Sequence, residues 1–268
     1  MTKSNEALIV TIGNFQFAVV NDHYADFWHS VERGEWEPET LCSLSTVLSP
    51  QWQYYDIGTW MGPTALFGAT LGAKTYCFEP DPVAFARLAA NVALNPSLKH
   101  DMTLTNAAVG TAAGKLTLYA DALGNSETSI FSRRDRVGGT IVASTQIQVE
   151  MIDFLSFYRG NNDSGMPQLF KIDIEGAEFE FLPYIAADIL KNPRTAILLS
   201  THSFNIADRS SRRQAKENVL RPFADLRWYR YHEGRVVPAD GASEIANALN
   251  HADAAGEHFV ANFDILGR

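Results

Sequence analysis

From Gln53 onward, the sequence alternates between short apolar runs and longer helical segments, and this pattern restricts the fold more than any other feature. Five runs have the composition of β-strands: residues 54–58, 74–79, 102–110, 169–174 and 196–203. Helical segments at 63–71 and 82–94 separate the first three runs. This alternation predicts an α/β protein with a mostly parallel sheet and helices on both faces. Ligands of such sheets bind at the carboxyl ends of the strands, where we expect the functional residues.

Further segments complete the predicted architecture. An insertion between the third and fourth strands contains strand-like runs at 115–120 and 145–150. Beyond the fifth strand we expect a helix at 212–223 and strands at 226–232 and 258–263. We therefore predict one Rossmann-like domain over residues 51–268.

The first 50 residues have a different pattern. Residues 7–20 form two β-type runs that meet at Gly13-Asn14, a sequence typical of a hairpin turn. Residues 22–48 look helical in two pieces, broken near Gly34 and Pro38. A segment of this size is too short to build its own core. We expect residues 1–50 to form a hairpin and helical cap on the larger domain.

Composition excludes several classes of protein. The formal net charge of −9 argues against a general affinity for nucleic acid or anionic membranes. No apolar run approaches the length of a membrane span, and the N-terminus lacks a signal-peptide core. The two cysteines, Cys42 and Cys77, make neither a disulfide framework nor a metal knuckle. We expect a cytoplasmic protein with no resident metal.

The turn after the first strand of the alternating region predicts a nucleoside site. Gly58 and Gly62 follow Asp56 at this strand-to-helix turn, and Glu79 ends the next strand 21 positions after Gly58. An acid at that point is placed to bind ribose hydroxyls. The glycines follow a GxxxG pattern, however, and Trp60 occupies the region where a dinucleotide site needs a glycine.

A nucleoside without phosphates fits this turn, since the sequence also lacks the GK[ST] signature of a triphosphate site. S-adenosylmethionine is such a nucleoside, and the Asp56 carboxylate suits its positive charge. Asn106 and Ala107 end the third strand, where the adenine edge is expected and where an amide can bind the base. The alternative is an ordinary strand-to-helix turn, in which the glycines only close the packing and Asn106 is a turn residue.

Three stretches of sequence together resemble one family. They are DIGTWMGPTALFGATLGAKTYCFEPDPVAFARLAANVALNP (56–96), NAAVG (106–110) and KIDIEGAEFEFLP (171–183). The chain is similar here to the FkbM-type methyltransferases, a branch of the class I S-adenosylmethionine-dependent enzymes. The resemblance implies a seven-stranded Rossmann-like sheet and methyl transfer, usually to an oxygen such as a sugar hydroxyl.

The resemblance also implies roles for particular residues. Asp56, Gly58 and Gly62 would line the methionine part of the donor. Glu79 would bind the ribose, and Asn106 and Ala107 would bind the adenine.

The fourth and fifth strands end in candidates for the chemistry. Methyl transfer needs donor and acceptor held in line, and a hydroxyl acceptor must also lose its proton to a carboxylate or histidine. Asp173 and Glu175 follow the fourth strand, and His202 ends the fifth. The alternatives are helix capping for the two acids and a structural role for the histidine. These three residues could also hold a divalent cation with an acceptor diol.

Neighbouring polar residues receive weaker assignments. The spacing of Glu178 and Glu180 around apolar residues predicts a solvated helix face. Ser126 and Ser129 lie in a polar loop that could contact the donor or the acceptor.

The leading hypothesis is an S-adenosylmethionine-dependent O-methyltransferase that acts on a sugar, a glycan or a small metabolite. The second hypothesis is a non-catalytic Rossmann-like module that binds a nucleoside. A dehydrogenase is a third interpretation, which Trp60 in the phosphate turn disfavours.

Overall fold

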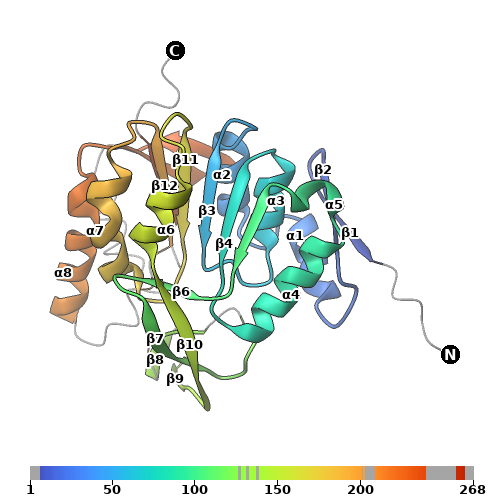
Figure 1. The fold of residues 1–268 in the computed structure, drawn as a ribbon, viewed down its shortest axis with the longest axis horizontal. Helices are drawn as coiled ribbons and strands as arrows, with labels where there is room; N and C mark the ends of the chain where they lie inside the picture. Colours follow the sequence, from blue (N-terminus) through green and yellow to red (C-terminus); the bar gives the residue numbers. More distant parts are fainter. Residues whose placement is uncertain are drawn as a thin grey trace.

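A computed structural model describes residues 7–125, 128–130, 133–136, 139–200, 202, 209–239 and 258–262. Its central sheet has eight strands, in the order β14-β13-β15-β12-β11-β3-β4-β5 (Figure 1). Five neighbouring strands run parallel: β3 (Gln53–Ile57), β4 (Lys74–Phe78), β5 (Met102–Thr105), β11 (Gln168–Ile172) and β12 (Thr195–Ser200). The α/β class with a mostly parallel sheet is therefore confirmed.

The far edge of the sheet contains one strand more than the seven that the resemblance implies. β15 (His258–Asn262) lies antiparallel between β12 and β13 (Arg227–His232). The additional strand is β14 (Arg235–Pro238), which pairs with β13 as a hairpin. Glu233 and Gly234 connect them, both with positive φ, as a two-residue hairpin turn requires.

The parallel strands are buried on both faces because successive side chains point in opposite directions. Tyr54 and Leu169 pack on one face with α3 (Pro63–Thr70) and α4 (Pro82–Ala93). Tyr55 and Phe170 stack on the other face, with ring centroids 4.7 Å apart. That second face is covered by α6 (Phe154–Asn161), α7 (Glu178–Ile189) and α8 (Arg209–Leu220).

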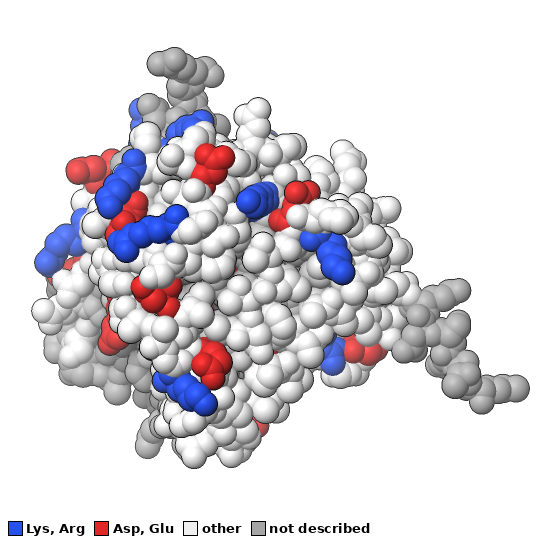
Figure 2. Space-filling view, in the orientation of Figure 1, with Lys and Arg blue, Asp and Glu red and all other residues white. Residues whose placement is uncertain are grey.

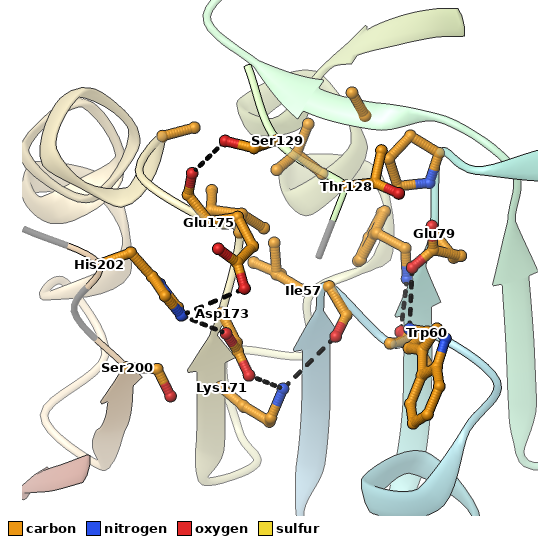
Figure 3. Close-up of a pocket in the computed structure, with 18 of the residues that line it drawn as sticks. Ile57, Trp60, Glu79, Thr128, Ser129, Lys171, Asp173, Glu175, Ser200 and His202 are labelled. Atoms are coloured by element: carbon orange, nitrogen blue, oxygen red, sulfur yellow. Dashed lines mark hydrogen bonds and ion pairs between the residues drawn. The ribbon is translucent and has the colours of Figure 1, made fainter. Parts of the chain in front are cut away.

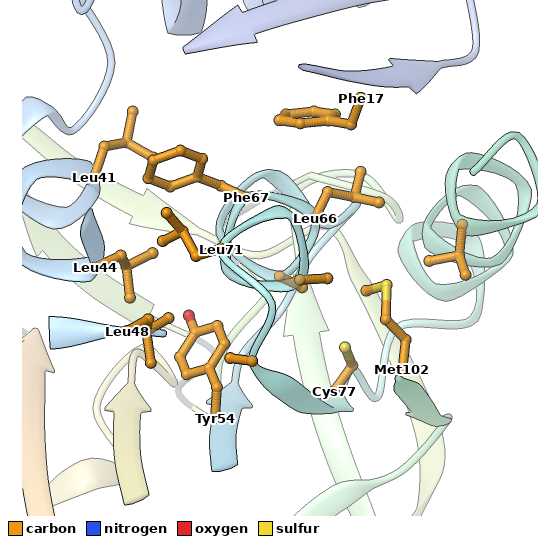
Figure 4. Close-up of a cluster of buried hydrophobic side chains, with 14 of the residues drawn as sticks. Phe17, Leu41, Leu44, Leu48, Tyr54, Leu66, Phe67, Leu71, Cys77 and Met102 are labelled. Carbon is orange, nitrogen blue, oxygen red and sulfur yellow. The ribbon is translucent and has the colours of Figure 1, made fainter. Parts of the chain in front are cut away.

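The N-terminal extension folds as a hairpin followed by two helices, as expected. Its elements are β1 (Leu8–Ile12), β2 (Phe15–Val19), α1 (Ala25–Glu32) and α2 (Pro38–Val47). Phe17 and Leu44 belong to the same apolar cluster as Tyr54 of the central sheet (Figure 4). Asn95 also accepts a hydrogen bond from the Ala18 N–H of β2, at 2.8 Å. The extension therefore shares its core with the first face of the sheet.

The insertion forms a second, smaller sheet in the order β6-β10-β7, drawn below the central sheet in Figure 1. Its strands are β6 (Ala108–Gly110), β7 (Gly114–Ala120) and β10 (Thr145–Asp153), and β8 (Arg133–Arg136) pairs with β9 (Gly139–Val142) beside them. The short helices α5 (Pro96–Lys99) and η2 (Arg221–Phe223) complete the described elements.

The third predicted strand, 102–110, is therefore two strands in different sheets. The chain leaves the central sheet after Thr105, and the Asn106 side chain donates a hydrogen bond to the Glu79 carbonyl at 2.8 Å. The contact lies at the point where the chain passes from the central sheet to the smaller sheet.

Candidate functional site

A pocket lies at the carboxyl ends of β3, β4, β11 and β12, the edge that the sheet topology predicts (Figure 3). Six of the nine predicted site residues line it: Gly58, Glu79, Ala107, Asp173, Glu175 and His202. The other three, Asp56, Gly62 and Asn106, do not line it. The pocket therefore joins residues predicted for the donor with residues predicted for the chemistry. Ser129 also lines it, whereas Ser126 lies outside the described residues.

Gly58 makes the close approach that shapes the pocket floor. Its φ is +84°, and a Cβ atom at this position would lie 1.8 Å from the Asp173 carbonyl oxygen. Its N–H donates a hydrogen bond to the Phe78 carbonyl of β4, at 3.1 Å. The turn after β3 is thus pressed against both neighbouring strands, which only glycine permits. Gly62 has a different role, since it begins α3 with a φ of +99°.

Glu79 lines the pocket from the end of β4, and its carboxylate is held by backbone donors. Its Oε2 accepts a hydrogen bond from the Trp60 N–H at 2.8 Å, and its Oε1 accepts one from the Asp81 N–H at 2.7 Å. Burial raises the pKa of Glu79 to about 8. These contacts fix the carboxylate at the strand end, where a ribose is expected.

Asp56 pairs with a cation that the sequence analysis did not identify. Lys171 stands opposite Asp56 in the β3–β11 register, and Lys171 Nζ lies 3.5 Å from Asp56 Oδ1. Both side chains are almost fully buried, and Thr64 Oγ1 donates to Asp56 Oδ2 at 2.7 Å. Asp56, which was predicted to meet the positive charge of a ligand, is thus already paired with the ammonium group of Lys171. The signal in the sequence was a lysine inside an otherwise apolar strand.

Lys171 extends this pair toward the pocket. Its Nζ lies 3.2 Å from Asp173 Oδ2 and donates a hydrogen bond to the Gly58 carbonyl at 3.4 Å (Figure 3). Burial alone lowers the pKa of Lys171, but the carboxylates of Asp173, Asp56 and Glu37 raise it above its ordinary value. The side chain is therefore an ammonium group in the pocket floor.

The three residues predicted for the chemistry lie together. His202 Nε2 is 3.5 Å from Asp173 Oδ1 and 3.6 Å from Glu175 Oε1 (Figure 3). Glu175 has a φ of +51°, in the turn between β11 and α7, and its carbonyl accepts a hydrogen bond from Ser129 Oγ at 2.6 Å. Burial lowers the pKa of His202. The neighbouring carboxylates of Glu175, Glu178 and Asp173 outweigh this effect and raise the pKa of His202 to about 10. His202 is thus an imidazolium at neutral pH.

The prediction that Glu178 lies on a solvated helix face is wrong. Glu178 is fully buried at the start of α7, whereas Glu180 is exposed. Glu178 Oε1 accepts a hydrogen bond from the His202 N–H at 2.6 Å, and its Oε2 accepts one from the Gly176 N–H at 2.8 Å. The helical period indicates that Glu178 is buried, because it lies on the same face of α7 as four buried apolar residues: Phe181, Leu182, Ile185 and Ile189.

The N-terminal extension also reaches the pocket. Trp36 and Glu37, which directly precede α2, both line it. Nothing in the local sequence distinguishes them from other residues of a helix–helix connection. They come to the site because α2 packs against α3 in the shared core.

Among the described residues, the structure has neither a metal-binding cluster of side chains nor a helix that could span a membrane. No group of three or more His, Cys, Asp or Glu side chains there has an arrangement that could hold a metal ion. None of the helices described is long and apolar enough to cross a membrane. On the face shown in Figure 2, basic and acidic side chains are interspersed.

The order of the central strands and the position of the pocket define the class of protein. β5-β4-β3-β11-β12 form a parallel run, next to which β15 is antiparallel and β13 parallel again. With the pocket across the carboxyl ends of its central strands, this is the class I methyltransferase fold.

The chain belongs to the FkbM methyltransferase domain family, whose model matches residues 54–229. Membership of a methyltransferase family gives the dehydrogenase interpretation no support. No curated protein matches the chain.

Solved structures with a similar fold have little sequence identity to this chain. The methyltransferase FkbM of Methylobacillus flagellatus is 13% identical with a TM-score of 0.46, and the match covers 91% of this chain and 56% of that one. A SAM-dependent methyltransferase of Agrobacterium tumefaciens is 11% identical with a TM-score of 0.41, and the match covers 96% and 70%. This chain therefore spans little more than half the length of the first relative.

The charges in the pocket suit a cationic donor. Its lining includes the carboxylates of Glu37, Glu79, Asp173 and Glu175, and two basic side chains, Lys171 and His202. Because a nearby cation favours the charged form of a carboxyl group, Glu37 and Glu79, whose pKa values are raised, would ionise more readily beside the sulfonium and ammonium groups of S-adenosylmethionine. Glu79 would hold its ribose, and Gly58, which allows the backbone to approach closely, would face its methionine part.

Proposed function

We propose that the protein methylates a hydroxyl group of a sugar, a glycan or another small metabolite. When bound, S-adenosylmethionine supplies an electrophilic methyl group. The observation that supports a hydroxyl acceptor is the pair of carboxylates, Asp173 and Glu175, at the strand end beside the donor site. A hydroxyl must lose its proton as it accepts a methyl group, and a positioned carboxylate can take that proton.

Within this pair we assign proton removal to Glu175. Asp173 lies between two cations, since its Oδ2 faces Lys171 at 3.2 Å and its Oδ1 faces His202 at 3.5 Å. Two positive neighbours favour the ionised carboxylate and make it a weak proton acceptor. Glu175 also lines the pocket, and its Oε1 lies 3.6 Å from His202 Nε2.

His202 then acts as a positioning residue. As an imidazolium it cannot itself take a proton, but it holds the carboxylates of Asp173 and Glu175 on one side of the pocket. Glu178 fixes the imidazole from the opposite side, with Oε1 3.3 Å from Nδ1.

The free thiols Cys42 and Cys77 support a reducing compartment, and we place the protein in the cytoplasm.

The test is release of S-adenosylhomocysteine with a panel of monosaccharides, glycosides and hydroxylated metabolites. Glu175→Gln is expected to lower kcat by about 10²–10⁴-fold while leaving S-adenosylhomocysteine binding unchanged. His202→Ala should lower kcat and also shift its pH profile, which loss of packing alone would not do. Methylation only of amines or carbon acids would contradict the hydroxyl assignment. Full turnover in Glu175→Gln would contradict the assignment of the base, and donor binding without any turnover would favour a non-catalytic module.

A further inference from the structure

Glu37 brings a carboxylate from the N-terminal extension into a pocket that is lined mainly by the methyltransferase domain. It lines the pocket together with Gly58, Lys171 and Asp173. Residue 37 precedes the segment 54–229 that matches the family model. Glu37 therefore contributes to the site from outside the segment that defines the family.

The backbone at Glu37 is held in an unfavourable conformation. Its φ and ψ are 40° and 53°, in the left-handed region that residues other than glycine rarely adopt. Pro38 follows directly, and a residue before proline prefers an extended backbone. Local preference therefore does not account for this conformation, and such departures are concentrated at ligand sites.

One oxygen of the Glu37 carboxylate, Oε2, is buried. Among the described residues, none donates a hydrogen bond to Glu37 Oε2, which is inaccessible to solvent. Burial and the Asp173 carboxylate raise the pKa of Glu37 to about 7, whereas Lys171 lowers it. A buried acceptor without a donor is unfavourable, so a ligand that supplies an N–H group would complete the site.

The position of Glu37 indicates which part of the donor supplies this group. Glu79 and Ala107 mark the nucleoside end of the pocket, at the ends of β4 and β5. Glu37 instead lines the pocket near Lys171 and Asp173, on the β11 side, close enough for their charges to shift its pKa. A sulfonium carries no hydrogen to donate, whereas an α-ammonium group has three donors. We propose that Glu37 binds the α-ammonium group of the donor's amino acid tail, so that the extension completes the donor site.

This inference rests on S-adenosylmethionine as the donor and not on the identity of the acceptor. The test compares two ligands by calorimetry without any acceptor. S-adenosylhomocysteine carries the amino acid tail, whereas 5′-methylthioadenosine has the same nucleoside and thioether but lacks the tail. Glu37→Gln should weaken S-adenosylhomocysteine binding by about tenfold or more, the effect of losing a charge-assisted hydrogen bond. Binding of 5′-methylthioadenosine should be unchanged.

Glu39→Gln is the matched control, because Glu39 lies in the same first turn of α2 but does not line the pocket. It should bind both ligands as the wild type does. Equal weakening of both ligands in Glu37→Gln, or no weakening of either, would overturn the proposal.

A second variant, Glu37→Asp, keeps the charge but shortens its reach, and it should also lose affinity for S-adenosylhomocysteine alone. Failure of the wild type to bind S-adenosylhomocysteine would overturn the proposal together with the donor assignment. If the proposal of a hydroxyl acceptor is wrong, only the turnover assays would show it, because the binding measurements contain no acceptor.

Discussion

Glu178 Oε1 accepts a hydrogen bond from the His202 backbone N–H at 2.6 Å and lies 3.3 Å from His202 Nδ1. One buried carboxylate thus fixes both the strand end and the imidazole. Glu178→Gln keeps the shape of the side chain but removes its charge. The pKa of His202 should fall from about 10 toward its usual value near 6.5, as NMR titration of the imidazole would show.

Glu180→Gln is the control for this titration, because Glu180 is exposed on the same helix. It should leave the His202 titration unchanged. An unaltered His202 pKa in Glu178→Gln would show that Glu178 does not hold the imidazole in its charged form.

Glu79 makes stability depend on pH. Its folded pKa of about 8 lies above the ordinary value of 4.5, so the folded state binds more protons between these values. Stability should therefore fall as pH rises from about 4.5 to 8, by an amount on the order of a few kcal/mol. Urea denaturation at several pH values measures it, and Glu79→Gln should flatten the dependence.

Two other groups act in the same direction and can be separated from Glu79. Glu37, with a folded pKa of about 7, also loses its contribution as pH rises through that value. His202 contributes stability that is fully present below 6.5 and is lost as pH rises through about 10. The window from pH 4.5 to 6.5 therefore separates the two glutamates from His202. A slope there that Glu79→Gln does not reduce would contradict this prediction.

Lys171→Met should destabilise the protein strongly. Loss of the ammonium group leaves Asp56 buried without its cation, and breaking a buried ion pair costs about 3–5 kcal/mol. Urea denaturation would measure the free energy of unfolding. The double variant Lys171→Met/Asp56→Asn removes both charges and should recover part of the loss. Equal destabilisation in the single and double variants would argue that packing, rather than charge, explains the effect.

Gly58→Ala tests the close approach under the pocket. The new Cβ would meet the Asp173 carbonyl, so unfolding should require less free energy and S-adenosylhomocysteine binding should be lost. Gly34→Ala is the matched control, since Gly34 also has a positive φ but open space around it. That control should cost only the strain of the left-handed backbone, about 1–2 kcal/mol. Equal losses in the two variants would show that contact with Asp173 is unimportant.

Much of the fold was predictable because local patterns correspond to local structure. The alternation of strand and helix signals gave the parallel sheet, and the rule for its carboxyl edge placed Gly58, Glu79, Asp173 and His202 near one another. The Gly13-Asn14 turn likewise indicated the first hairpin. These features depend on residues close in sequence or on a general property of one fold class.

The break after Thr105 was not predictable in the same way. Residues 102–110 have the composition of one strand, but the folded chain divides them between two sheets at Asn106, which bonds the Glu79 carbonyl. Position at the end of the strand was also insufficient to predict the role of Asn106. Its side chain donates a hydrogen bond to the backbone carbonyl of Glu79 and does not line the pocket.

The sequence by itself determined the order of the elements, the glycine turn and the family, because each is written in spacing along the chain. Tertiary structure alone decided which charges meet. Asp56 lies opposite Lys171 in the strand register, and the buried Glu178 binds His202. Glu37 reaches the pocket because it directly precedes α2, which packs against α3. These pairs join residues 24 to more than 100 positions apart. Their energies depend on burial and distance, which exist only once the chain has folded.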